Sequence, residues 1–117
     1  MKQKYFVLVA ICCSIQAGLQ AQTSCARPAP ADVFTPNGDG INDKWEIMCL
    51  FDFPDNELTV FNRWGAQVYK ASGYDQNWDG TNATDNKPLE QGTYVYVLHY
   101  TDQQEKQQVS GTVTIVR

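Results

Sequence analysis

Two segments of the sequence alternate with a period of two residues, which is the period at which side chains change face along a β-strand. Thr93 to Tyr100 has tyrosine or leucine at every second position, and Val109 to Val116 alternates in the same way. The polar stretch Thr101 to Gln108 joins the two, so we expect them to pair as an antiparallel hairpin across a turn in that stretch. Because no window after the N-terminal segment shows a helical period, the alternation predicts an all-β domain.

Shorter strand-like segments precede this hairpin and define the rest of the expected fold. They are Val33-Phe34, then Lys44 to Leu50 with Trp45, Ile47 and Cys49 on one face, then Glu57 to Asn62 with Leu58 and Val60 together, then Gln67 to Lys70. Between the last two, Arg63 to Ala66 is a turn in which Gly65 can take a positive φ. About seven short strands separated by turns predict a small antiparallel Greek-key (immunoglobulin-like) β-sandwich.

The N-terminus has the layout of a secretory signal peptide, residues 1–21. Lys2 and Lys4 are followed by an uncharged apolar run from Tyr5 to Ile15 and by Ala21, a small residue just before the expected cleavage point. The apolar run is too short for a bilayer, which needs roughly 20 residues, so no membrane span is expected after signal removal. A packed N-terminal helix is the alternative interpretation, and no cysteine here has the preceding residues that a lipoprotein signal needs.

Removal of the signal peptide would leave two of the four cysteines, Cys25 and Cys49. An even count in an exported chain favours one disulfide, with two buried free thiols as the alternative. The bond would tie a short linker, residues 22–31, to an early strand of the domain, residues 32–117. Two prolines in that linker disfavour helix and weaken strand pairing. Closing the loop would stabilise the fold by about 3 kcal/mol.

Charge and histidine content exclude several classes of function. The chain has 9 Lys+Arg against 13 Asp+Glu, so it lacks the basic stripe that binds a phosphate backbone, and no nucleic-acid partner is expected. The single histidine, His99, is expected to be half-buried and hydrogen-bonded in a strand, which leaves no catalytic constellation and argues against an enzyme. At least two of Trp45, Trp64 and Trp78 are expected in the core, and an exposed ligand platform is the alternative.

Two polar loops resemble calcium loops, and each is incomplete. The candidate ligands are Asp75, Asn77 and Asp79 in one loop and Asn37, Asp39 and Glu46 in the other. Oxygen atoms at alternate positions followed by glycine suit calcium. However, Asn86 replaces the twelfth-position glutamate of the first loop, and Thr35 replaces the leading acid of the second. Calcium is the one cofactor we leave open, and the alternative for both loops is a turn capped by its own Asn and Asp side chains.

Five blocks of sequence follow one another in a characteristic order. They are Val33 to Asp43, Leu58 to Gly65, Trp78 to Gly80, Gly92 to Tyr96 and Gly111 to Arg117. The motif residues within them are Asn37, Gly38, Asp39, Gly40, Asn62, Arg63, Trp64, Gly65, Trp78, Asp79, Gly80, Gly92 and Tyr94. Together the blocks resemble the gliding motility-associated C-terminal domain, the type B sorting domain of the type IX secretion system of Bacteroidetes, over residues 32–117.

The resemblance implies a non-catalytic sorting and surface-attachment domain. Such a domain folds in the periplasm and is recognised by the outer-membrane translocon of the type IX secretion system, which carries it to the cell surface or the extracellular space. Family members usually have a long cargo region before the domain, whereas here only about ten residues separate it from the signal peptide. A stand-alone product and a fragment therefore both stay open. The alternative function is a small secreted, calcium-supported module that binds carbohydrate or protein through exposed aromatic side chains.

Overall fold

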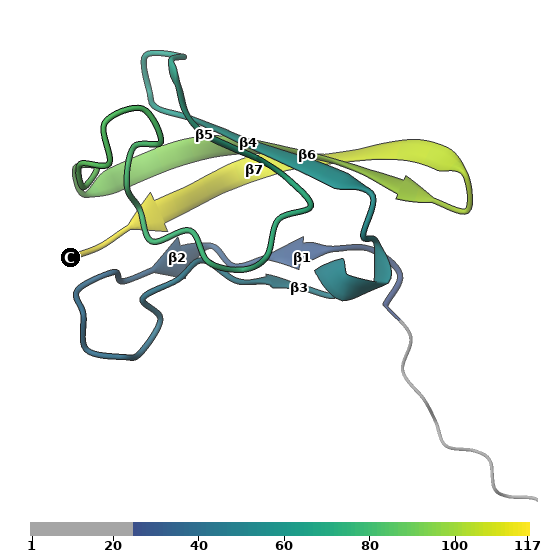
Figure 1. Cartoon of the computed structure of the whole chain (residues 1–117), viewed down its shortest axis with the longest axis horizontal. Helices are drawn as coiled ribbons and strands as arrows, with labels where there is room; N and C mark the ends of the chain where they lie inside the picture. The colour runs from purple at the N-terminus through teal and green to yellow at the C-terminus, as the bar shows by residue number, and fades with distance from the viewer. Residues whose placement is uncertain (1–24) are drawn as a thin grey trace, which may run out of the picture.

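Strands dominate residues 25–117, the part of the chain that the computed structural model describes (Figure 1). They are β1 (Ala29–Pro30), β2 (Val33–Phe34), β3 (Ile47–Met48), β4 (Asn56–Phe61), β5 (Gln67–Ser72), β6 (Gly92–Asp102) and β7 (Glu105–Ile115), with one 3-10 helix, η2 (Leu50–Asp52), after β3. The predicted all-β class is therefore confirmed. The predicted signal peptide, residues 1–21, lies outside the described residues. Among those described, no helix has the length and apolar character to cross a membrane.

The strands form two sheets that face each other as the layers of a small sandwich (Figure 1). The large sheet has the order β2-β7-β6-β4-β5, and the small sheet pairs β1 with β3. Every pairing is antiparallel except that of β2 with β7, which is parallel and aligns Val33 with Thr114 and Phe34 with Ile115. A parallel pair needs a long connection rather than a hairpin, and nearly the whole domain separates these two strands.

The longest hairpin joins β6 and β7, as the alternation predicts. Its register runs without a break from Gly92 opposite Ile115 to Asp102 opposite Glu105. The turn is only Gln103 and Gln104, with φ values of 51° and 71°. We expected a turn between residues 101 and 108, and the observed turn is much shorter. It is short because two glutamines adopt the left-handed conformation that glycine or asparagine usually supplies in such turns.

The core lies between the two layers and takes its side chains from alternate positions of the long strands. Its largest members are Trp45, Trp78, Phe34, Ile47, Leu50, Leu58, Leu98, Ile115, Val60 and Val113. Two tryptophans are therefore in the core, as expected, while the third, Trp64, is 79% exposed. His99 is hydrogen-bonded, with Nε2 2.9 Å from Gln108 Oε1, but its predicted half-burial is wrong, because position 99 of β6 faces solvent.

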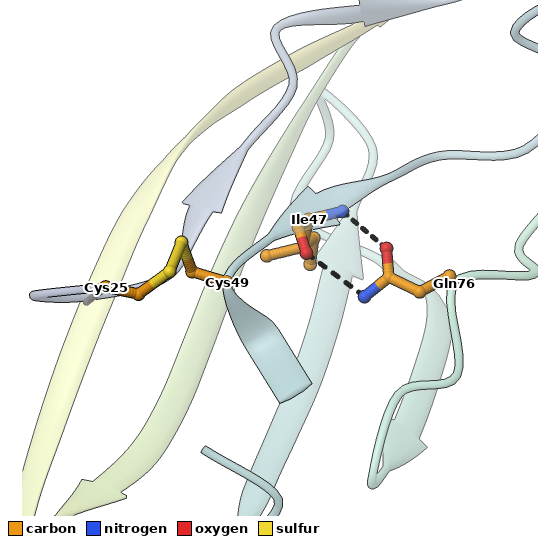
Figure 2. Close-up of a disulfide and its surroundings, with 4 residues drawn as sticks. All are labelled: Cys25, Ile47, Cys49 and Gln76. Atoms are coloured by element: carbon orange, nitrogen blue, oxygen red, sulfur yellow. Dashed lines mark hydrogen bonds between the residues drawn. A yellow bond between two sulfur atoms is a disulfide. The ribbon is translucent and has the colours of Figure 1, made fainter. Parts of the chain in front are cut away.

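The small sheet is covered at one of its edges, that of β3. Part of the segment expected to be a linker forms β1, and β3 is shorter than the predicted strand because Cys49, at φ 70°, turns the chain into η2. On the other side of β3, the side-chain amide of Gln76 pairs with Ile47 as a neighbouring strand would (Figure 2). Ile47 N–H donates to Gln76 Oε1 at 2.7 Å, and Gln76 Nε2 donates to Ile47 O at 3.1 Å. This side chain satisfies a strand edge that would otherwise be open.

Candidate functional site

The disulfide lies at the opposite end of the domain from the chain's last strand residues. Cys25 and Cys49 are bonded, with their Cα atoms 5.6 Å apart, so the predicted pair is confirmed (Figure 2). The bond fastens the segment before β1 to the residue where β3 gives way to η2. It therefore secures the entry of the chain into the small sheet and leaves the motif loops at the other end to be held by other contacts.

The first motif loop, residues 35–43, is organised around the carboxylate of Asp43. Asp43 Oδ1 accepts hydrogen bonds from the backbone N–H of Asn37 at 3.1 Å and of Gly38 at 2.9 Å, while Oδ2 accepts from Gly40 N–H at 2.7 Å. The bond from Gly40 contributes most to lowering the pKa of Asp43, against a smaller opposing effect of desolvation. A single ionised side chain thus stabilises one conformation of the turn by hydrogen bonds to its backbone.

The proposed calcium ligands of this loop already have partners inside it. Asn37 Oδ1 accepts a hydrogen bond from Asp39 N–H at 3.1 Å, and Asp39 Oδ1 accepts from Ile41 N–H at 2.8 Å. These are the side-chain-capped turns of the alternative interpretation. Glu46 follows outside the loop, and its backbone carbonyl accepts from Ala31 N–H at 3.0 Å in the small sheet. Calcium binding here stays a prediction.

The second candidate calcium loop shows the same local bonding. Asn77 Nδ2 donates to Asp75 Oδ2 at 3.1 Å, and Thr81 Oγ1 donates to Asp79 Oδ1 at 2.8 Å. Over residues 25–117, no three His, Cys, Asp or Glu side chains are grouped closely enough to hold a metal ion. The candidate ligands include asparagines, however, and calcium also accepts amide and carbonyl oxygens. This loop therefore also stays a prediction.

Trp78, the first residue of the Trp-Asp-Gly block, anchors its loop in the core. Its indole contacts that of Trp45 edge-on, with ring centroids 5.9 Å apart, and Nε1 donates to Thr81 O at 2.9 Å. The hydroxyl of Tyr74 accepts from Trp78 N–H at 3.0 Å and donates to Trp45 O at 2.6 Å. Burial raises the pKa of the Tyr74 hydroxyl, which keeps this donor protonated.

Arg117 joins segments that are far apart in the sequence. Its guanidinium donates three hydrogen bonds to backbone carbonyls: Nη1 to Pro36 at 3.0 Å, Nη2 to Gly80 at 3.1 Å and Nε to Leu89 at 3.0 Å. The backbone N–H of Arg117 also donates to Gln91 Oε1 at 3.0 Å. We call this set of contacts the Arg117 junction. It joins the first, third and last motif blocks through a planar group whose several donors point in fixed directions.

Gly80 is required by the packing at this junction. Its φ is 82°, which is unfavourable for residues with a side chain, and a Cβ there would lie 3.2 Å from both Arg117 Nη2 and Pro36 Cγ. Gly80 O also accepts from Leu89 N–H at 2.8 Å. The glycine of the Trp-Asp-Gly block therefore allows the guanidinium and two loops to approach one another.

The turn between β4 and β5 displays the second motif block. Asn62 Oδ1 accepts hydrogen bonds from the backbone N–H of Trp64 and of Ala66, both at 2.9 Å, and Gly65 takes a φ of 83°. Arg63 lies over the exposed indole of Trp64, with its guanidinium carbon 5.0 Å from the ring centroid. We call Arg63 and Trp64 the Arg63–Trp64 tip.

An open pocket of about 350 Å³ lies beside this tip. Its lining includes Asn62, Arg63, Trp64, Glu90, Gly92 and Tyr94, so the pocket joins the second and fourth motif blocks. The hydroxyl of Tyr94 donates to Glu90 O at 2.8 Å. Partial burial and the Glu90 carboxylate raise the pKa of Tyr94, while the charges of Arg117 and Arg63 oppose that rise.

Sequence reasoning identified the motif blocks and missed the residue that connects them. Arg117 appeared only as the last residue of the fifth block and was given no role, and the backbone carbonyls of Pro36 and Leu89 carry no side-chain signal at all. An arginine that directly follows an alternating strand, in a chain with several glycine loops, was the available hint. Asp43, the last residue of the first block, was a second hint, since its carboxylate accepts the hydrogen bonds that hold the first motif loop.

The comparisons with known proteins agree with the motif blocks. A protein-family model described as CHU_C Type IX secretion signal domain matches residues 29–115, the span from the first residue of β1 to the last of β7. No curated protein matches the chain.

Proposed function

Because the chain belongs to the CHU_C type IX secretion signal domain family, we propose that its folded part is a sorting domain that directs export across the outer membrane. Its destination is the cell surface or the extracellular space, and its partners are the outer-membrane translocon and associated proteins of that system. Within the family we assign it to the gliding motility-associated, type B kind, on the order of its five motif blocks.

The observation that carries this proposal is the Arg117 junction. Pro36 and Arg117 are 81 positions apart in sequence, yet the guanidinium of one bonds the carbonyl of the other. Gly80 and Leu89 are drawn to the same group. The motif blocks thus form one end of the folded domain, which supports recognition of a folded surface rather than of a linear peptide.

A non-catalytic role fits the same structure. His99 is exposed on β6 and its Nε2 is 2.9 Å from Gln108, on the neighbouring strand and away from the motif end. The side chains that line the pocket beside the tip are amides, aromatics, aliphatic residues and a threonine, with one arginine and one carboxylate as the charged groups. We propose that they bind rather than react.

The exposed Trp64 also favours the second candidate, a secreted module that binds carbohydrate or protein. The two functions separate in one experiment. Residues 22–117 are fused behind a fluorescent reporter that carries its own signal peptide, in a bacterium that has the type IX system and in a mutant that lacks its translocon. A sorting domain delivers the reporter to the surface only in the first strain. Equal surface delivery in both strains, or periplasmic reporter in both, would contradict sorting.

A further inference from the structure

The conformation of the turn between β4 and β5 exposes Trp64 to solvent. Its ring makes no contribution to the core, and 79% of the residue is open to solvent. Four hydrogen bonds hold the turn: Asn62 Oδ1 accepts from two backbone N–H groups, Asn62 N–H donates to Ala66 O, and Gly65 N–H donates to Asn62 O. A large aromatic side chain is therefore presented to solvent on a well-defined backbone, which is typical of a binding hot spot.

Arg63 completes the tip with donors that the domain does not use. Its guanidinium stacks on Trp64, and across residues 25–117 the one ion pair is that of Lys70 with Glu57. Within the same residues the Arg63 side chain has no hydrogen bond, whereas the side chain of Arg117 donates three. An arginine over a ring keeps the N–H donors at the edge of its own guanidinium plane, where they match the two oxygens of a carboxylate.

The charges around the pocket distinguish this corner from the rest of the domain. The whole chain has a net charge of -4, yet Arg63 lines the pocket and Arg117 donates hydrogen bonds to two residues of its lining, Leu89 and Gln91. Glu90 is the one carboxylate in the pocket lining. The guanidinium of Arg117 bonds only neutral carbonyls, so its charge is not cancelled by its partners. A guanidinium with unused donors beside an exposed aromatic ring is complementary to an acidic ligand.

We propose that the Arg63–Trp64 tip and the pocket beside it bind an acidic segment of a protein partner, with a carboxylate on the Arg63 guanidinium and an aromatic or aliphatic side chain against the Trp64 indole. The pocket, at about 350 Å³ and open, suits one or two side chains of a peptide. This names the kind of partner for the proposed sorting function and rests on that function for its biological meaning, but the binding itself is testable without it.

The direct test uses two capped tetrapeptides as probes. One contains aspartate, phenylalanine, glutamate and aspartate, and the other has asparagine and glutamine in place of the acids. Each is titrated to millimolar concentration into the ¹⁵N-labelled protein while the tryptophan indole signals are followed by NMR. The indoles of Trp45 and Trp78 are internal controls, because both rings are buried. Their N–H groups donate to the backbone carbonyls of Ala31 and Thr81.

The acidic peptide should shift the Trp64 indole signal and leave the other two in place, and added salt should weaken the effect. Its amide counterpart should bind roughly tenfold more weakly or worse. Arg63→Glu should lose the acidic peptide and gain affinity for a lysine-phenylalanine-lysine-lysine probe. Equal binding of the acidic and amide peptides, an unmoved Trp64 signal at millimolar peptide, or unchanged binding by Arg63→Glu would each overturn the proposal.

Matched variants connect the binding to delivery. Phe51, 85% exposed at the disulfide end, provides the control substitution Phe51→Ala. Arg63→Glu and Trp64→Ala should reduce surface delivery of the reporter fusion, and Phe51→Ala should not. If the wild-type fusion is delivered and both tip variants are delivered equally, the tip proposal fails while sorting stands. If the wild-type fusion is never delivered but the acidic peptide binds at Trp64, the sorting function fails instead.

Discussion

Arg117 and Gly80 lie in direct contact at the motif end of the domain. Nη2 of Arg117 donates to Gly80 O at 3.1 Å, and the same nitrogen would lie 3.2 Å from a Cβ on residue 80. A side chain at residue 80 would push the guanidinium and Pro36 away by a few tenths of an ångström, so the hydrogen bond is favoured by the glycine.

Gly80→Ala should destabilise the domain more than Gly65→Ala. Both glycines have φ values above 80°, but a Cβ on Gly65 meets nothing within 4 Å. We expect Gly65→Ala to lower the free energy of unfolding by about 1 kcal/mol through backbone strain alone. Gly80→Ala adds steric conflict with Arg117 and Pro36, for a total of roughly 2 to 3 kcal/mol. Urea denaturation measures both, and equal losses would show that the Arg117 junction does not depend on Gly80.

Arg117→Ala should loosen the motif loops more than the sheet. Three hydrogen bonds to carbonyls are lost, and we expect the free energy of unfolding to fall by about 1 to 2 kcal/mol. The amide of Leu89, which bonds Gly80 O, should exchange with solvent faster, while the amides of the β6–β7 hairpin stay protected. Arg117→Lys should be nearly as damaging, because one ammonium cannot reach three carbonyls that lie in different directions. Unchanged exchange at Leu89 would contradict this role.

Loss of the disulfide should lower the free energy of unfolding by about 3 kcal/mol, because the bond closes a loop with a sequence separation of 24. The double variant Cys25→Ser with Cys49→Ser tests this without a reducing agent. Its denaturation curve should shift to lower urea with little change in slope. A double variant as stable as the wild type would mean that the bond contributes nothing to folding.

Acid should weaken the first motif loop through Asp43. Hydrogen bonds, foremost that from Gly40, lower the folded-state pKa of this carboxyl below its ordinary value of 3.8. The carboxylate therefore contributes stability above the unfolded pKa, and that contribution is lost as the pH falls through the folded pKa. Asp43→Asn should be less stable than the wild type at pH 7, and the difference should shrink in acid. Thermal melts at neutral pH and near pH 2 measure it, and a gap that is constant with pH would be the contrary result.

Calcium, if it binds, should raise the melting temperature modestly. A ligand at ten times its dissociation constant adds about 1.4 kcal/mol to the free energy of unfolding. Asp75→Asn with Asp79→Asn removes the charge of one loop, and Asp39→Asn with Glu46→Gln removes that of the other. The pair that abolishes the calcium effect identifies the loop. Melting curves that coincide in millimolar calcium and in chelator would exclude both.

The faces of the strands could be read from the sequence, whereas several of their ends and partners could not. Alternation correctly placed Tyr94 and Leu98 on one face of their strand, because side-chain direction follows from strand geometry alone, and the structure shows that this face lies in the core. The two-residue turn at Gln103 and Gln104 has no glycine or asparagine to mark it, so the turn was expected to be longer.

The candidate site was predictable in its residues and not in its arrangement. Glycine, asparagine and tryptophan blocks are visible as motifs, but hydrogen bonds from Arg117 to the carbonyls of Pro36 and Gly80 depend on long-range topology. In particular, β2 must lie parallel to β7 before Pro36 comes within reach. The sequence pattern shows Val33-Phe34 as a strand and is silent on its partner.

The separation of Pro36 and Arg117 in the sequence also determines when their contact can form during synthesis of the chain. A ribosome adding roughly 5–20 residues per second needs about 4–16 s to make the 81 positions between the two. Until then the loops at Pro36, Gly80 and Leu89 have no guanidinium to hold them. A receptor that binds only the assembled end would therefore ignore nascent and truncated chains, and transport across the outer membrane would begin only after synthesis of the domain is complete.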